Sequence, residues 1–271
     1  MLIRFGYDIT VSVVHDTPMI CMMSVRDERR DDLRLQSQVI TMPPVQTTSY
    51  RDLFGNTCRR VVVPAGEFTL RADCTIESSE EPDAIKVWLR ETPIAQLPDD
   101  VLIYLLGSRY CETDKLSQVA WDLFGQTAPG HARVQAICDY VHNRIRFNYQ
   151  NARSTRTAYE GWQEQTGVCR DFAHLAIAFC RCMNIPTRYV NGYLGDIGVP
   201  VTGPMDFAAW MECYLDGGWH TFDPRNNKPR IGRIVVAYGR DAADVPLIHS
   251  FGTHVLQKFL VWTDRVELVP T

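Results

Sequence analysis

Strict alternation of apolar and polar residues near the start of this 271-residue chain is the feature that most constrains its fold. Successive side chains of a strand point to opposite faces, so alternation predicts a strand with one buried face. The pattern covers residues 3–13 and recurs over 68–76, with turn signals at Gly55-Asn56 and Pro64-Ala-Gly66 between them. Residues 61–63 are a further strand candidate, and we expect an antiparallel sheet or sandwich. The alternating positions are Ile3, Phe5, Tyr7, Ile9, Val11, Val13, Phe68, Leu70, Ala72, Cys74 and Ile76.

The centre of the chain has helical rather than strand periodicity. Apolar residues fall on one helix face over 116–124 and 134–145, and a third helix is expected between Gly167 and Asn184. Strands are predicted to return at 187–193, 207–215, 219–222 and 255–268. Acidic, turn-rich residues 77–83 and prolines 93 and 98 suggest a boundary near residue 95. The expected organisation is a β-rich N-terminal domain, 1–95, followed by an α+β unit, 96–271.

Composition excludes several classes of protein. Hydrophobic and charged contents of 45% and 22% are typical of a globular chain, and a net charge of −4 without a long basic block disfavours nucleic-acid binding. Asp8 interrupts any signal peptide, and no apolar run is long enough to cross a membrane. Nine cysteines, an odd number, favour reduced thiols in the cytoplasm. We find no phosphate loop or metal-ligand motif, so no cofactor and no metal are expected.

Cys169 is the leading candidate for chemistry. A cysteine attacks as its thiolate, which the positive end of a helix dipole stabilises, and Cys169 follows Gly167 where a helix should begin. Free N–H groups of that first turn could also hold an oxyanion. The alternative is a buried structural thiol, but the preceding polar, glycine-marked run favours function. Asp171 is expected in the first helical turn.

A predicted hairpin supplies a carboxylate but no base. If Asp216-Gly217 is a two-residue turn, Leu215 pairs with Gly218 and Asp223 lies opposite Trp210. Asp223 then shares a face with position 208, about 7–8 Å away between backbones. A histidine at 208 would reach this carboxylate, which would fix its tautomer. The residue there is Ala208, which cannot carry a proton and leaves Asp223 without this histidine partner.

Three blocks carry a family resemblance, which covers roughly residues 100–230. Residues 167–176 (Gly-Val-Cys-Arg-Asp-Phe-Ala-His-Leu-Ala), 185–193 (Ile-Pro-Thr-Arg-Tyr-Val-Asn-Gly-Tyr) and 219–224 (Trp-His-Thr-Phe-Asp-Pro) occur in order. The chain resembles the transglutaminase-like superfamily, in particular its bacterial cysteine-protease-like branch. The resemblance implies a papain-like core, in which helices pack on an antiparallel sheet, and a Cys–His–Asp triad. Cys169 matches the nucleophile and Asp223 the carboxylate, whereas the family's His-Ala-Trp motif reads Ala208-Ala209-Trp210 here.

Other residues are weaker candidates. Gln163 or Gln165 could donate to an oxyanion, and Trp210 could form a cleft wall, although solvated loops and core packing explain them equally simply. Asp206 and Glu212 could bind a basic group but are expected to be solvated. His220 should alternate to the face opposite Asp223, and His174 should project from another side of the helix. His249 and His254 stay open as replacement bases.

The expected function is amide chemistry on a peptide or protein substrate. Cys169 would form a thioester, passed to water by a peptidase or amidase or to an amine by a transglutaminase, and we favour water. Without its base this chain is expected to be nearly inactive, whether the alanine is engineered or natural. The rival is a non-catalytic peptide- or protein-binding module, and a weaker option is a sugar–peptide amidase. The sequence does not fix the oligomeric state.

Overall fold

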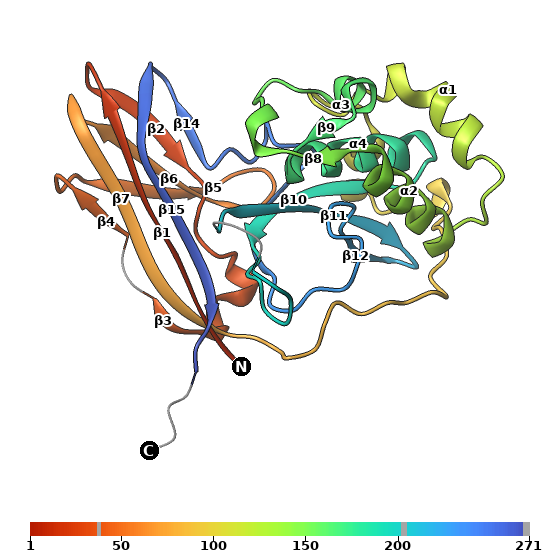
Figure 1. Ribbon diagram of the computed structural model, residues 1–271, viewed down its shortest axis with the longest axis horizontal. Coiled ribbons are helices and arrows are strands. Elements are labelled where there is room, and N and C mark those ends of the chain that lie inside the picture. The colour runs from red at the N-terminus through yellow and green to blue at the C-terminus, as the bar shows by residue number, and fades with distance from the viewer. Residues whose placement is uncertain (37–38, 202–204, 268–271) are drawn as a thin grey trace.

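The computed structural model describes residues 1–36, 39–201 and 205–267. A β-rich part contains both ends of the chain, and a second part packs helices on a further sheet (Figure 1). The α+β class and the β-rich N-terminal region predicted from the sequence are confirmed.

The β-rich part consists of two antiparallel sheets. One has the order β15-β1-β7-β3, with β4 also paired to β7, and the other has the order β14-β2-β6-β5. The alternating apolar residues of 3–13 and 68–76 are largely buried, as expected, and only Cys74 among them is partly exposed. The strands are β1 (Leu2–Val13), β2 (Thr17–Cys21), β3 (Leu33–Gln36), β4 (Ile40–Met42), β5 (Thr47–Arg51), β6 (Thr57–Val63), β7 (Gly66–Glu77), β14 (Ile248–Ser250) and β15 (His254–Arg265).

The C-terminal strand returns to the first sheet. β15 pairs with β1 from Ile3↔Arg265 to Val13↔His254. The expected final strand is therefore present, with Leu268 outside the described residues. However, a division into 1–95 and 96–271 does not describe this arrangement, because residues 254–265 complete the N-terminal sheet. Local sequence patterns carry no information about which distant strand a segment will join.

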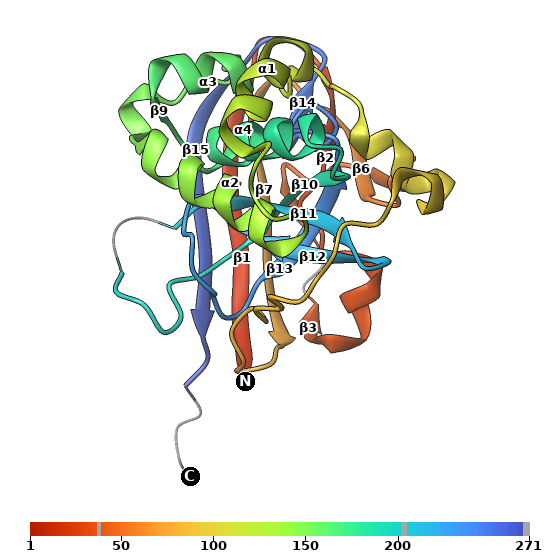
Figure 2. The ribbon, with the colours of Figure 1, turned by 90° about the vertical axis from the view of Figure 1, so that its right-hand side faces the viewer.

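The second part is built around a buried helix. α4 (Cys169–Cys182) packs on the sheet β12-β11-β10-β13, and the other helices surround it, as Figure 2 shows. The Sγ atoms of Cys180 on α4 and Cys213 on β11 lie 4.0 Å apart in this interface. The sheet strands are β10 (Thr187–Tyr193), β11 (Phe207–Leu215), β12 (Gly218–Phe222) and β13 (Ile234–Gly239).

The three predicted helices are confirmed, and shorter elements join them. The sequence analysis missed α3, although Thr157 and Glu160 form a capping box at its start. The remaining elements are η1 (Asp27–Asp32), η2 (Ile94–Gln96), η3 (Asp99–Leu105), α1 (Thr113–Phe124), α2 (His131–Arg144), β8 (Arg146–Phe147), η4 (Tyr149–Asn151), α3 (Ala158–Glu164) and β9 (Thr166–Gly167). Within the described ranges, no helix is both long and apolar enough to cross a membrane.

Candidate active site

A buried carboxylate fixes the N-terminus of α4. Asp171 accepts a hydrogen bond from the backbone N–H of Val168 at 2.9 Å, and its oxygens pair with Arg156 at 3.1 Å and Arg170 at 3.2 Å. Gly167 lets this happen, since a Cβ there would lie 2.6 Å from the Cβ of Asp171. Cys169 is thus the first residue of α4, as predicted, on a rigidly held turn.

Cys169 lines a pocket of about 580 Å³, called here the Cys169 pocket. Ala208 and Ala209 of β11 line the same pocket, so the structure brings Cys169 and position 208 together. β12 ends at Phe222, opposite Met211, and so leaves residues 207–210 of β11 unpaired with it.

The pKa of the Cys169 thiol is raised to about 11. Burial is the main cause, because a thiolate loses hydration there. The Arg225 guanidinium and the backbone N–H groups of Ala209 and Arg170 lower this pKa, whereas the Asp206 carboxylate raises it. The helix terminus does supply N–H donors, but burial outweighs their effect on this pKa.

Asp206 is closer to the chemistry than expected. It lines the Cys169 pocket and accepts a hydrogen bond from the N–H of Phe207 at 2.6 Å. Burial raises its pKa, partly offset by Phe207 and by Arg225. Glu212 was expected to be solvated, but it is buried and forms an ion pair with Arg188 at 2.6 Å. Glu212 thus faces protein, whereas Asp206 is partly exposed.

The predicted hairpin register is confirmed. Leu215 pairs with Gly218, and Asp216 and Gly217 have φ values of 46° and 79°, as a tight two-residue turn requires. The paired register ends at Phe222, one residue before Asp223. The Arg233 guanidinium contacts both Asp223 and Trp210, since it pairs with the Asp223 carboxylate and lies 4.9 Å from the centre of the Trp210 ring.

Asp223 has polar partners other than a histidine. Its Oδ1 accepts the N–H of Asn226 at 2.9 Å, and its Oδ2 accepts Asn226 Nδ2 at 2.7 Å and Arg233 Nη2 at 2.8 Å. The pKa of this carboxyl is lowered, because Arg233 and the Asn226 donors outweigh the cost of burial. Asp223 lines a separate pocket of about 290 Å³ that also includes His220. The sequence analysis missed Arg233, whose spacing from Asp223 carries no recognisable signal.

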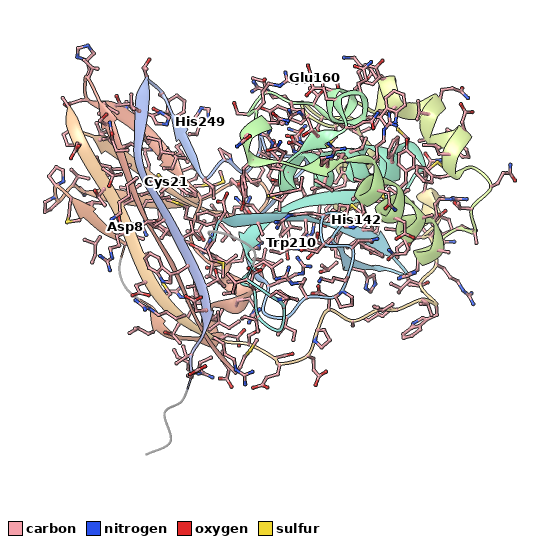
Figure 3. The ribbon with its side chains drawn as sticks, viewed as in Figure 1. Asp8, Cys21, His142, Glu160, Trp210 and His249 are labelled. Atoms are coloured by element: carbon pink, nitrogen blue, oxygen red, sulfur yellow. The ribbon has the colours of Figure 1, made fainter. Side chains whose placement is uncertain are left out.

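The weaker candidates lie away from the thiol. Gln163, on α3, donates to the Tyr159 hydroxyl at 3.1 Å, and Gln165 caps that helix in a left-handed conformation, with φ 55°. Both side chains are exposed, and neither lines the Cys169 pocket. Trp210 does not line it either: this ring is fully buried within the second part of the molecule (Figure 3).

Of the histidines considered, one reaches the pocket wall. His254, at the start of β15, lines the Cys169 pocket. His174 is fully buried, accepts the N–H of Ala242 at 3.1 Å through Nε2, and has a pKa lowered well below its usual value, chiefly by burial. His249 lies on β14, in the β-rich part (Figure 3). Across the described residues, no group of three His, Cys, Asp or Glu side chains is placed to hold a metal.

Comparison with known proteins agrees with this geometry. Residues 118–224, which include Cys169, Ala208 and Asp223, match the family model of the transglutaminase-like superfamily. The chain carries a transglutaminase-like domain. This confirms the resemblance read from the three sequence blocks.

Similarity to known proteins also extends beyond these residues. A crystal structure of a candidate cysteine protease from Cytophaga hutchinsonii superposes with a TM-score of 0.88 at 29% identity, covering 100% of this chain and 92% of that one. Uncharacterized proteins of Mycobacterium leprae and Mycobacterium tuberculosis are 25% and 29% identical over 218 and 233 residues. They cover 77% and 75% of this chain, and the matches span 77% and 71% of those relatives. The fold is therefore cysteine-protease-like along its whole length.

Proposed function

We propose that this site performs amide-directed acyl chemistry with Cys169 as the nucleophile. The sulfur adds to the carbonyl carbon of a peptide or side-chain amide, the C–N bond breaks, and the amine leaves with one proton. Water then cleaves the thioester to release the acid and restore the thiol. The likeness to a candidate cysteine protease favours water over an amine as the acyl acceptor.

One observation carries the proposal: the Cys169 thiol lies at the N-terminus of α4 and lines the same pocket as position 208. The N–H groups of Arg170 and Ala209, which lower the thiol pKa, are suited to stabilise negative charge on an oxyanion as well. The pocket, at about 580 Å³, is large enough for a few residues of a peptide.

We further propose that the chain, as it stands, turns over very slowly. A thiol pKa of about 11 leaves roughly one thiolate in ten thousand at pH 7. A histidine at position 208 would both withdraw the thiol proton and deliver it to the leaving amine, and Ala208 can do neither. The residue proposed to orient such a ring is Asp223, whose Oδ1 accepts one hydrogen bond, whereas a carboxylate oxygen can accept two.

Restoring the base tests this proposal. We expect Ala208→His to raise the hydrolysis of a panel of peptide and isopeptide amides by at least about a hundredfold, the usual contribution of a positioned acid–base group. Ala208→Asn is the size control and should gain nothing. Ala208→His combined with Cys169→Ser should be inactive. If Ala208→His folds and shows no gain on any amide, the enzymatic proposal fails.

The alternative is a peptide- or protein-binding module that holds its partner without cutting it. The absence of a base from position 208 is the observation that favours it. Two measurements together separate the two functions. The first is peptide capture by this chain and by Cys169→Ala, and the second is the amide hydrolysis activity of Ala208→His. A binding module retains capture in both chains and gains no turnover. Sequencing codon 208 of the native gene would establish whether the alanine is natural.

A further inference from the structure

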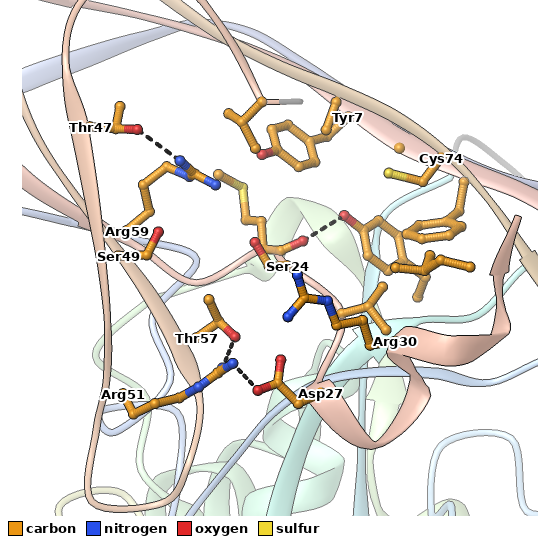
Figure 4. Close-up of a pocket in the computed structure, with 18 residues that line it drawn as sticks. Tyr7, Ser24, Asp27, Arg30, Thr47, Ser49, Arg51, Thr57, Arg59 and Cys74 are labelled. Atoms are coloured by element: carbon orange, nitrogen blue, oxygen red, sulfur yellow. Dashed lines mark hydrogen bonds and ion pairs between the residues drawn. The ribbon is translucent and has the colours of Figure 1, made fainter. Parts of the chain in front are cut away.

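The largest described cavity lies far from the thiol in sequence, within the β-rich part. It has a volume of about 670 Å³ and is bounded by strands of both N-terminal sheets, by η1 and by Tyr193 of β10. None of its lining residues lines the Cys169 pocket. We call it the basic pocket, and Figure 4 shows the side chains that point into it.

Positive charge predominates in the basic pocket. Its lining contains three guanidinium groups, Arg30, Arg51 and Arg59, against one carboxylate, Asp27, which gives a net charge of +2 in a chain of net charge −4. Asp27 is paired with Arg51. Arg59 donates to the neutral hydroxyl of Thr47 at 2.7 Å. No ion pair joins Arg30 or Arg59 to a carboxylate within the described ranges, so two cations are available to an incoming anion.

The lining of the basic pocket also contains apolar and aromatic side chains. Phe5, Tyr7 and Tyr193 are almost completely buried, and Leu33 and Val39 pack beside them. The Tyr193 hydroxyl already donates to the carbonyl oxygen of Met23 at 3.2 Å, so its polar atom has a partner within the protein. A ligand here meets both hydrophobic side chains and guanidinium groups.

We propose that the basic pocket binds a small organic anion that has an apolar body and a carboxylate or phosphate head. The head would bind Arg30 and Arg59, since guanidinium groups form strong charge-assisted hydrogen bonds with both kinds of anion. The apolar body would cover the ring of Tyr193 and its neighbours, where burial of apolar surface is favourable. The volume is typical of small-molecule sites.

Titration calorimetry with three probes of equal chain length tests the proposal on the whole chain. Octanoate and octyl phosphate carry the two candidate heads, and 1-octanol is their neutral counterpart. We expect one or both anions to bind at least about tenfold more tightly than 1-octanol, and the preferred anion identifies the head. Equal binding of 1-octanol, or no binding of either anion, would overturn the proposal.

Arginine variants locate the site. Arg59→Gln and Arg30→Gln should each weaken binding of the preferred anion about tenfold, as expected for loss of one charge-assisted contact. Arg60→Gln is the matched control, because the exposed Arg60 is the next residue of β6 and stacks on Tyr50 outside the lining. An equal loss in the Arg60 variant would refute the assignment. Thermal unfolding without ligand confirms that each variant is folded, and Cys169 chemistry does not enter the readout.

Discussion

Replacing Arg233 by methionine should be strongly destabilising, because its guanidinium is the buried counter-charge of Asp223. The side chains of Arg233 and Asp223 are 8% and 4% exposed, and Arg233 also bonds Asp83 at 2.8 Å. Removing one partner of a buried ion pair leaves an unpaired charge, which costs about 3–5 kcal/mol. We expect Arg233→Met to lower the free energy of unfolding by that amount at pH 7, measured by urea denaturation.

The loss should depend on pH in a defined direction. The pKa of Asp223 is lowered in the folded protein, so its stabilising effect is complete above the unfolded value, about 3.9, and disappears as pH falls through the folded value. In the variant, burial without Arg233 should raise this pKa above 3.9, so the variant loses stability as pH rises. The difference between the two proteins should therefore be largest at pH 7 and smaller near pH 4.5.

Two controls separate charge from packing. Combining Arg233→Met with Asp223→Asn removes both charges and should recover much of the lost free energy at pH 7. Arg265→Met breaks the exposed pair with Glu80 at 3.1 Å and should cost less than about 1 kcal/mol. A loss below about 1 kcal/mol for Arg233→Met, or one that does not change with pH, would refute the reasoning.

Three further substitutions test the packing and ion pairs of the second part of the molecule by urea denaturation. Gly130→Ala should lower the free energy of unfolding by about 1–3 kcal/mol, since φ is 85° and the new Cβ would lie 2.3 Å from the carbonyl oxygen of Leu89. Gly217→Ala is the control and should cost less, because φ is similar, at 79°, but no atom lies near the new Cβ. Equal losses would show that the clash is unimportant. Asp171→Ala should cost about 3–5 kcal/mol by removing the buried carboxylate that pairs with Arg156 and Arg170, and a loss under about 1 kcal/mol would contradict its capping role. The pKa of His174 is lowered in the folded protein, so its contribution to the free energy of unfolding is complete above about pH 6.5. Below that pH the free energy of unfolding should fall by up to about 1.4 kcal/mol per pH unit. His174→Gln should remove this pH dependence, and an unchanged dependence would refute the argument.

Local patterns predicted much of the fold. The hairpin at Asp216-Gly217 was placed in register because a two-residue turn fixes which residues pair. The start of α4 at Cys169 followed from Gly167 and the helical periodicity after it. These features depend on neighbours in the sequence, so a single chain contains the information needed.

The features missed depend on distant contacts. β15 joins β1 across more than two hundred residues, and no local signal specifies that pairing. The partner of Asp223 is Arg233, brought back by the return of the chain into β13, and sequence spacing does not reveal that approach. The raised pKa of Cys169 likewise follows from burial, which outweighs the helix terminus that the sequence made visible.

The pH dependence of Cys169 alkylation tests the central claim most directly. Iodoacetamide rates are measured from pH 6 to 11, with the Cys169→Ser chain subtracted to remove the other eight thiols. We expect the rate in this chain to keep rising towards a pKa of about 11, and the inflection in Ala208→His to move to a clearly lower pH. An inflection in this chain near or below pH 8, unchanged by the histidine, would contradict the account.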